Sequence, residues 1–520
     1  MSSYGFFKFI GAMAVFGGLA GYYKAYLQRE KRKQADVPSG TYGEARFATL
    51  EDCEAAGLLD PHGIYLGLLD GQPLFFKGKA HIATVGPARS GKGVGIVFPG
   101  LFHSPDSMAV SDMKGELAAV TAKHRAERFG HKIIIFNPWG LHDLPQHRIN
   151  PLQSVIELAS DPRLQRGLMD EVKAIALELY PEPEDSRNRY FREGSRSILR
   201  AVLAYLALER PQQCSLPEMW RIIASPRRLT RAIEDMSRSD ALFGLLADLG
   251  DNLGSQIDDN PDQFADFLAG ALQVLDPYQP GSYCGDAMSG SDIALDALKR
   301  EPVTIYLVIP QERITTHGPA LGLIINRMIT AIARSDGKRK VLFVLDEFAN
   351  LGKLSGLAES LTALPGLGVR VWMIVQELAE LVRIYGPHTA TTILSQAEVQ
   401  QFLAVREIKL AKRLAEAMGQ MTVKTVNFNL GRFDDDEVGQ SLSESGQLLM
   451  RPEKIMQMGK YDQLLFVTGL PPIKAQRIPF WFIQPWGRWA APNPVEGGYP
   501  IEPPVVELSY ERKGSDHERV

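Results

Sequence analysis

The sequence contains the run Gly86-Pro87-Ala88-Arg89-Ser90-Gly91-Lys92-Gly93. This glycine-rich turn joins a short apolar run, His81 to Val85, to a segment that can begin a helix. Successive backbone N–H groups in such a turn can point at a phosphate, while Lys92 brings a positive charge to the outer phosphates. The pattern predicts a phosphate-binding loop in which all eight residues are candidate nucleotide ligands. It departs from the usual form at Gly93, where such loops carry Ser or Thr.

A second motif, Val341-Leu342-Phe343-Val344-Leu345-Asp346-Glu347, lies far downstream. It is typical of a buried strand that delivers two carboxylates to its C-terminal end. That placement suits one acid held near Mg²⁺ and one that polarises a water molecule. The loop and the acidic strand occur in the expected order, each next to its expected element. Together they indicate a machine driven by nucleotide hydrolysis.

The composition describes an ordinary globular protein of two to four domains, with 520 residues, 45% hydrophobic and 23% charged. The formal net charge is −4, so no overall basic field attracts nucleic acid. Any DNA contact would have to come from a local patch or a symmetric pore, and no basic stripe interleaved with aromatic residues is evident for base stacking. The three cysteines show neither paired nor metal-ligand spacing, which suits a reducing compartment.

The N-terminal stretch from Phe6 to Tyr23 is almost wholly apolar or small and is interrupted only by Lys8. It is near the lower length limit of a membrane-spanning helix, ~17 residues. A basic cluster follows it, made up of Lys24, Arg29, Lys31, Arg32 and Lys33. This pattern predicts a single membrane anchor with the bulk of the chain in the cytoplasm. A cleaved signal peptide and an interfacial helix remain the alternatives.

The pattern beyond the anchor predicts an α/β fold with a mostly parallel sheet covered on both faces. The expected strands of this sheet are His81 to Val85, Met108 to Val110, Lys132 to Phe136, Val303 to Ile309, Val341 to Leu345, Val369 to Val375, Glu398 to Val405 and Gln463 to Val467. Between the third and fourth of these, helical periodicity replaces β-type runs, as in Ser195 to Leu208. An all-α domain is therefore expected as an insertion.

We accordingly expect five parts in the chain. They are a membrane anchor with its basic flank (1–33), a linker and β-rich lead-in (34–80), a nucleotide-binding domain (81–150 and 292–490), the inserted all-α domain (151–291) and a C-terminal tail (491–520). The acidic run Asp434 to Glu437 follows Phe433 and lacks the spacing of a calcium loop, so a solvated loop is expected there.

An ordered set of motifs resembles one known family. The set consists of Tyr42-Gly43-Glu44-Ala45-Arg46, GPARSGKGVG (Gly86 to Gly95), DMKGEL (Asp112 to Leu117), FNPWG (Phe136 to Gly140), INPL (Ile149 to Leu152), LDEFANLG (Leu345 to Gly352), VQELAEL (Val375 to Leu381) and TGLPPIKA (Thr468 to Ala475). These residues look like the coupling-protein family of type IV secretion and conjugation, the TraG-like membrane-anchored ATPases. The likeness covers about Gly43 to Trp481, and its specificity lies in the ordered set.

The resemblance implies a RecA-like P-loop NTPase that binds ATP and Mg²⁺ and assembles as a homo-hexamer on the inner membrane. Such rings receive a relaxase-bound single DNA strand, or protein effectors, and pass it to the components of a type IV secretion channel. The inserted helical domain is where the family would select its substrates. Many relatives carry two N-terminal spans, whereas this sequence offers at most one.

The resemblance also implies roles for individual residues. Lys92 matches the phosphate-binding lysine, Asp346 the acid that holds Mg²⁺ through water, and Glu347 the general base. Gln376 matches a polar sensor of the γ-phosphate. With Gly93 in place of a hydroxyl residue, Mg²⁺ would depend on Asp346, phosphates and water molecules.

Two features of the sequence leave alternatives open. Asp112 and Lys114 lie in a family motif, but a capped helix start would explain them equally well. An arginine finger is expected at subunit interfaces of such rings, and Arg370 and Arg327 are its candidates, with Arg370 closer in sequence to Gln376.

Two other functions remain open. A double-stranded DNA translocase ring would use the same loop and acids. A docking receptor would bind nucleotide without hydrolysing it, which Gly93 would favour.

Overall fold

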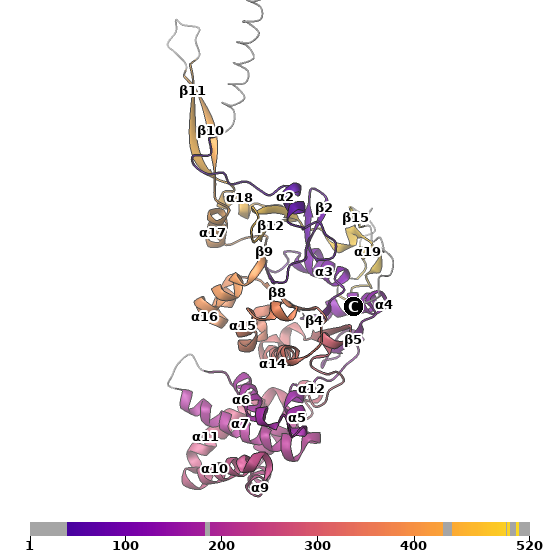
Figure 1. The fold of residues 1–520 in the computed structure, drawn as a ribbon, viewed down its shortest axis with the longest axis vertical. Coiled ribbons are helices and arrows are strands. Elements are labelled where there is room, and N and C mark those ends of the chain that lie inside the picture. The colour runs from indigo at the N-terminus through magenta and orange to yellow at the C-terminus, as the bar shows by residue number, and fades with distance from the viewer. Residues whose placement is uncertain (1–38, 183–187, 430–438, 496, 500–505, 509–520) are drawn as a thin grey trace, which may run out of the picture. The chain divides into compact units, whose positions relative to one another are not determined.

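The computed structural model describes residues 39–182, 188–429, 439–495, 497–499 and 506–508 (Figure 1). The described chain forms two compact units. One combines the residues up to Phe47 with Val405–Met458, and the other combines Ala48–Ala404 with the residues from Gly459 onward. None of the helices in the described ranges is both long and apolar enough to cross a bilayer. The predicted anchor, Phe6 to Tyr23, and the acidic run Asp434 to Glu437 lie outside the described residues.

An eleven-stranded sheet is the centre of the larger unit, with strand order β2-β1-β13-β12-β9-β3-β8-β7-β4-β6-β5. The strands in chain order are β1 (Ile64–Leu69), β2 (Gln72–Phe76), β3 (His81–Val85), β4 (Ser107–Asp112), β5 (Lys132–Phe136), β6 (Val303–Val308), β7 (Val341–Leu345), β8 (Val369–Val375), β9 (Ala397–Leu403), β12 (Asp462–Val467) and β13 (Ile473–Gln476).

Seven neighbouring strands, from β9 to β5 in that order, are parallel, and the other four continue the sheet in antiparallel pairs. Every residue of β3, β4, β6, β7 and β8 is buried, so both faces of the parallel part are covered. The predicted α/β fold with a mostly parallel sheet is confirmed. The sequence did not reveal that β1 and β2, from the expected lead-in, extend this same sheet through β13.

Helices accompany the strands along the larger unit. They are α2 (Leu50–Ala55), α3 (Phe98–His103), α4 (Glu116–Phe129), α13 (Ala297–Arg300), α14 (Ile314–Arg334), α15 (Ser355–Ser360), α16 (Leu378–Ser395) and α19 (Trp486–Trp489). Helix α4 begins after Gly115 and ends at Gly130. Both glycines have a left-handed backbone, which a residue without a side chain adopts without steric cost at the boundary of a helix. Two short strands, β14 (Ile483–Gln484) and β15 (Val506–Glu507), pair in parallel as a separate two-stranded sheet.

Between β5 and β6 the described residues form helices and no strand. These helices are α5 (Gln153–Ser160), α6 (Leu168–Leu179), α7 (Arg189–Glu209), α8 (Leu216–Ile223), α9 (Pro226–Ser237), α10 (Leu245–Asp259), α11 (Pro261–Leu275) and α12 (Tyr283–Ala287), and they group together in Figure 1. Arg327 connects this helical segment to α14, the helix between β6 and β7. Its guanidinium lies 2.7 Å from Glu171 and also pairs with Glu178, both on α6.

The smaller unit contains a long hairpin of β10 (Gln420–Asn429) and β11 (Gly439–Leu448), flanked by α17 (Ile408–Met418) and α18 (Pro452–Met456). The backbone N–H of Ala45 donates to the carbonyl oxygen of Gln420, which fastens the N-terminal residues to the base of the hairpin. The sequence does not predict this hairpin, because its strands are largely polar.

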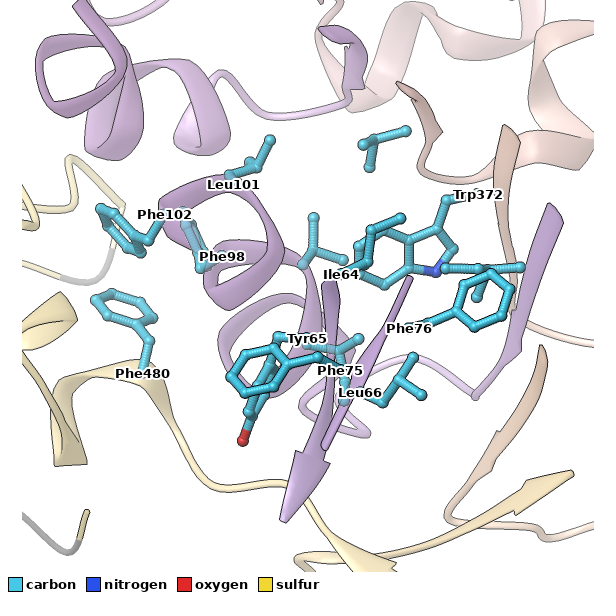
Figure 2. Close-up of a cluster of buried hydrophobic side chains, with 14 of the residues drawn as sticks. Ile64, Tyr65, Leu66, Phe75, Phe76, Phe98, Leu101, Phe102, Trp372 and Phe480 are labelled. Carbon is cyan, nitrogen blue, oxygen red and sulfur yellow. The ribbon is translucent and has the colours of Figure 1, made fainter. Parts of the chain in front are cut away.

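A hydrophobic core holds the helix that follows the glycine-rich turn (Figure 2). Phe98 and Phe102 of α3 both pack on Phe480, with ring centroids 5.0 and 5.3 Å away. On the same helix, Gly100 allows close contact with the indole of Trp372, because a Cβ placed at Gly100 would lie 2.6 Å from that ring. Replacing a buried aromatic ring of this kind by Ala typically costs about 3–5 kcal/mol. The position of α3 is therefore fixed by side chains that are distant in the sequence.

Three buried histidines lie near α3 and α4. The His124 ring stacks on Trp489 at 4.8 Å, and the His103 ring stacks on Phe75 at 4.5 Å. His131 lies 2.8 Å from the Thr304 hydroxyl. Burial lowers the pKa of His103 and His124 to about 4 and that of His131 to about 3. These rings are therefore neutral in the folded protein.

We expect the free energy of unfolding to fall as the pH falls from about 6.5 to 4. In that window the unfolded chain takes up protons on these histidines, and the folded protein does not until their lowered pKa values are reached. His124→Gln should make the slope shallower, by on the order of 3 kcal/mol or less across the window. Denaturant unfolding at a series of pH values measures this, and an unchanged slope in the variant would contradict the assignment.

Candidate functional site

The glycine-rich turn has the shape that its sequence predicts. It follows β3, and the Gly86 N–H donates to the carbonyl oxygen of Val375 at the end of β8. Arg89 and Gly91 both adopt a left-handed backbone, with φ of 60° and 81°. A π-helical turn, Gly93–Val97, then leads directly into α3. A wide turn of this kind is uncommon and occurs frequently at functional sites.

The carboxyl ends of four adjacent parallel strands meet around this turn. In the sheet order β3-β8-β7-β4, the loop follows β3, Gln376 follows β8, Asp346 follows β7, and Asp112 ends β4. Ligands of open α/β sheets bind at this edge. Strand order thus brings together residues that the sequence separates by hundreds of positions.

Lys92, Glu347 and Gln376 form one hydrogen-bonded group. The Lys92 ammonium lies 3.1 Å from Glu347 Oε1, and the two side chains are only 12% and 17% exposed. The Gln376 amide donates to both Glu347 oxygens, at 2.9 and 2.8 Å. The carboxylate is therefore held by one charged and one neutral donor, and its direction is fixed.

The backbone of Glu347 is left-handed, with φ of 52°, which is uncommon for a residue with a side chain. This conformation begins the short helix Phe348–Leu351. Such strain persists only where surrounding contacts stabilise it, and it concentrates at functional sites. Here the contacts of the Glu347 carboxylate with Lys92 and Gln376 provide that stabilisation.

Asp346 and Asp112 add two acidic groups beside this network. Desolvation raises the pKa of Asp346 to about 7, with Lys92 opposing the shift and Glu347 adding to it. Desolvation also raises the pKa of Asp112 to about 6. Asp112 accepts hydrogen bonds from the N–H groups of Lys114 and Ala118, at 3.3 and 2.8 Å, so it caps the start of α4. A nearby cation would favour the ionised form of Asp346.

Several features of the loop fit a bound phosphate chain. The Ser90 hydroxyl is buried and makes no hydrogen bond within the described structure. A Cβ placed at Gly93 would meet no atom within 4 Å, so the loop is open at that position. Among the described residues, no group of three or more His, Cys, Asp or Glu side chains is arranged to hold a metal ion. Asp346, the residue predicted to hold Mg²⁺, follows β7 at this same edge of the sheet.

The two candidate arginine fingers lie elsewhere. Arg370 is at the start of β8, the opposite end from Gln376, where it is 8% exposed and pairs with Asp106. Its guanidinium also donates to the Gly78 carbonyl oxygen at 3.3 Å. Arg327 is engaged by the two α6 carboxylates described above. An arginine finger needs a side chain free to reach another subunit, so a finger at either position stays a prediction that these contacts do not favour.

One residue that touches the loop is not predicted from the sequence. Arg477 follows β13 and lies against Gly91 and Gly95. In the sequence it is a single basic residue after a short strand, so no local signal distinguishes it. Only the course of the antiparallel strands brings it to the loop.

Comparison with known proteins identifies relatives over most of the chain. VirD4 of Rhizobium radiobacter is 25% identical over 468 residues, covering 85% of this chain and 64% of that protein. The conjugal transfer protein TraG of Escherichia coli is 26% identical over 521 residues, covering 87% of this chain and 78% of that protein. The chain spans 64 to 66% of the length of three VirD4 relatives that it matches.

Solved structures share the fold. The unbound conjugative coupling protein TrwB, lacking 70 N-terminal residues, has a TM-score of 0.61 at 18% identity and covers 85% of this chain and 96% of its own. TrwB in complex with ADP and Mg²⁺ has a TM-score of 0.60 at 17% identity, covering 84% and 94%. Residues 24–495 match the family described as type IV secretory system conjugative DNA transfer. Since this match extends over most of the chain, the protein belongs to that family, the coupling proteins of type IV secretion.

Proposed function

We propose that this protein is an ATP-hydrolysing coupling protein that brings a DNA strand or protein effectors to a type IV secretion channel and drives their transfer. The observation that carries the proposal is the contact of Lys92, Glu347 and Gln376 at the carboxyl ends of β3, β7 and β8. Family membership supports the same conclusion. TrwB, which shares the fold, has been solved with ADP and Mg²⁺ and with ADPNP.

The proposed chemistry is phosphoryl transfer to water, for which positioning and charge supply most of the rate. The loop amides cradle the phosphates, and Lys92 neutralises the outer ones. Mg²⁺, when bound, would offset charge on the transferred group, and Asp346 would hold it through water, since Gly93 offers no hydroxyl. Glu347 would orient the attacking water, and Gln376 would sense the terminal phosphate from the next strand.

The ion pair between Lys92 and Glu347 suggests how nucleotide binding activates the base. In the structure the Lys92 ammonium lies 3.1 Å from the Glu347 carboxylate. A phosphate on the loop competes for the ammonium because it carries more negative charge. Glu347 is then released from Lys92 while it keeps the Gln376 amide, and it can accept a hydrogen bond from water.

The remaining parts of the proposal rest on the family resemblance. We propose a homo-hexamer at the inner membrane, a relaxase-bound single DNA strand or effectors as cargo, and selection of that cargo by an inserted helical domain, residues 151–291. Fold-level analogy of this kind is associational. Capture of a relaxase or effector from the native host by the full-length protein would test it directly.

A docking receptor that binds nucleotide without turnover is the second candidate, and Gly93 is the observation that favours it. The missing hydroxyl removes one of the usual Mg²⁺ ligands of P-loop enzymes. Turnover near zero with purified oligomer, Mg²⁺ and DNA, together with tight effector binding, would favour this candidate over the ATPase.

Lys92→Ala should abolish nucleotide binding, and Glu347→Gln should keep binding but lose hydrolysis. We expect Glu347→Gln to reduce kcat by about 10²–10⁴, the usual contribution of a positioned general base. The variant should bind a non-hydrolysable ATP analogue at least as tightly as the wild type, because Lys92 no longer has a competing carboxylate. Steady-state ATPase assays and calorimetric titration measure both effects. Full ATPase activity in Lys92→Ala would refute the site.

Gly93→Ser should lower the Mg²⁺ concentration needed for half-maximal ATPase activity by several-fold. A Cβ placed at Gly93 would meet no atom within 4 Å, so the structure has space for the added side chain. Its hydroxyl would restore the Mg²⁺ ligand that P-loop enzymes usually carry at this position. Gly93→Ala is the matched control, since it adds the Cβ without the hydroxyl and should leave the Mg²⁺ dependence unchanged. Identical Mg²⁺ titrations of the two variants would show that the metal lies elsewhere.

Single-stranded DNA should stimulate the ATPase activity more strongly than double-stranded DNA when the two are compared at equal concentrations of DNA nucleotides. The comparison must be made at one fixed, low salt concentration, because phosphate contacts make DNA affinity salt-dependent. Stronger stimulation by double-stranded DNA would support the alternative of a double-stranded DNA translocase ring.

A further inference from the structure

Arg477 approaches the phosphate-binding loop from the antiparallel side of the sheet. It follows β13, and its N–H donates to the Tyr461 carbonyl oxygen at 2.8 Å, which fixes its backbone. The residue is only 3% exposed. Its position beyond β9 and β12 places it on the other side of β3 from Glu347 and Gln376.

The Arg477 side chain lies along the loop and the turn that follows it. A Cβ placed at Gly95 would lie 3.3 Å from Arg477 Cβ and 3.7 Å from its Cδ, so the aliphatic stem runs beside that glycine. A Cβ placed at Gly91 would lie 2.9 Å from Arg477 Nη1. The glycines at these two positions therefore leave room for the arginine, whose charged head lies next to the residue before Lys92.

The guanidinium lacks partners inside the described structure. Its Nε and Nη2 atoms are buried without a hydrogen bond in the described structure. The Asp462 carboxylate acts on the guanidinium through space and lies 3.9 Å from Lys474 Nζ. Burial lowers the pKa of Arg477 to about 10, which still leaves the group charged at neutral pH. Other buried arginines have their donors satisfied within the chain. Arg196 pairs with Glu182 at 2.8 Å and with Glu193 at 2.9 Å. Arg125 donates instead to the backbone carbonyl oxygens of Leu101, Ser104 and Asp106. A buried charge without such a partner is costly unless a ligand supplies it.

We propose that Arg477 is a further nucleotide ligand, whose guanidinium donates hydrogen bonds to a phosphate that is not transferred, the α- or β-phosphate. The inference rests on the proposed function of the loop. Glu347 and Gln376 follow β7 and β8, where they would face the terminal phosphate, so a group arriving from the β9 side of β3 would face the inner part of the nucleotide. Arginine suits this task because its planar donors match phosphate oxygens.

Arg477→Met tests the proposal, since it keeps the stem that lies on Gly95 and removes the charge. We expect the dissociation constants of ADP and of a non-hydrolysable ATP analogue to rise together by about tenfold or more, measured by calorimetry. CDP should be affected as much as ADP, because the contact is to phosphate. Without nucleotide, the thermal midpoint of the variant should be equal to or above that of the wild type, because an unpaired buried charge has been removed.

Arg196→Met is the matched control, because Arg196 is equally buried but paired. It should lower the thermal midpoint and leave ADP affinity unchanged. Arg477→Lys, which retains the charge, should fold and bind ADP with an affinity between those of the wild type and Arg477→Met. If Arg477→Met does not fold, the ADP affinity of Arg477→Lys tests the proposal instead. Unchanged ADP affinity, weakening of the ATP analogue alone, or weakening of ADP but not CDP would each overturn the proposal. Loss of ADP binding by the wild type itself would instead refute the proposed function.

Discussion

The ammonium of Lys92 is the charge around which the candidate site is organised. It lies 3.1 Å from Glu347, whose carboxylate is held on its other side by Gln376. These residues come from the ends of three adjacent strands that run in the same direction. Reversing any one of them would carry its polar end to the opposite edge of the sheet, so the site depends on the parallel order β3-β8-β7.

A hydrophobic core holds the strands of the site and the helix after the loop together. Trp372 of β8 lies under Gly100 of α3, and the Trp372 indole N–H also donates to the Thr84 hydroxyl of β3 at 2.8 Å. One side chain thus joins the strand before the loop, the helix after it and the strand that ends at Gln376. A binding loop mounted on elements held in this way keeps its geometry without a ligand, which favours binding because less ordering is needed.

The partners of a buried arginine indicate whether its role is structural or lies in binding. Arg327 and Arg370 both form ion pairs with carboxylates of the same chain, and each ion pair links two different segments of the fold. Arg477 lies beside the loop with two buried donors unsatisfied. Since an unpaired buried donor costs more than a typical hydrogen bond contributes, the difference in partners carries more information than burial alone.

The sequence by itself determined where the glycine-rich loop, the acidic strand end and most strands of the parallel sheet lie, including His81–Val85 and Val341–Leu345 with their bounds. These signals are local, because a strand buried on both faces must be a continuous apolar run and a phosphate loop must carry its glycines in order. Only the tertiary structure decided which strands are neighbours, that β1 and β2 extend the same sheet, and that Arg370 and Arg477 have different surroundings. Those outcomes depend on pairing between distant segments, and no residue pattern within one segment encodes its partner.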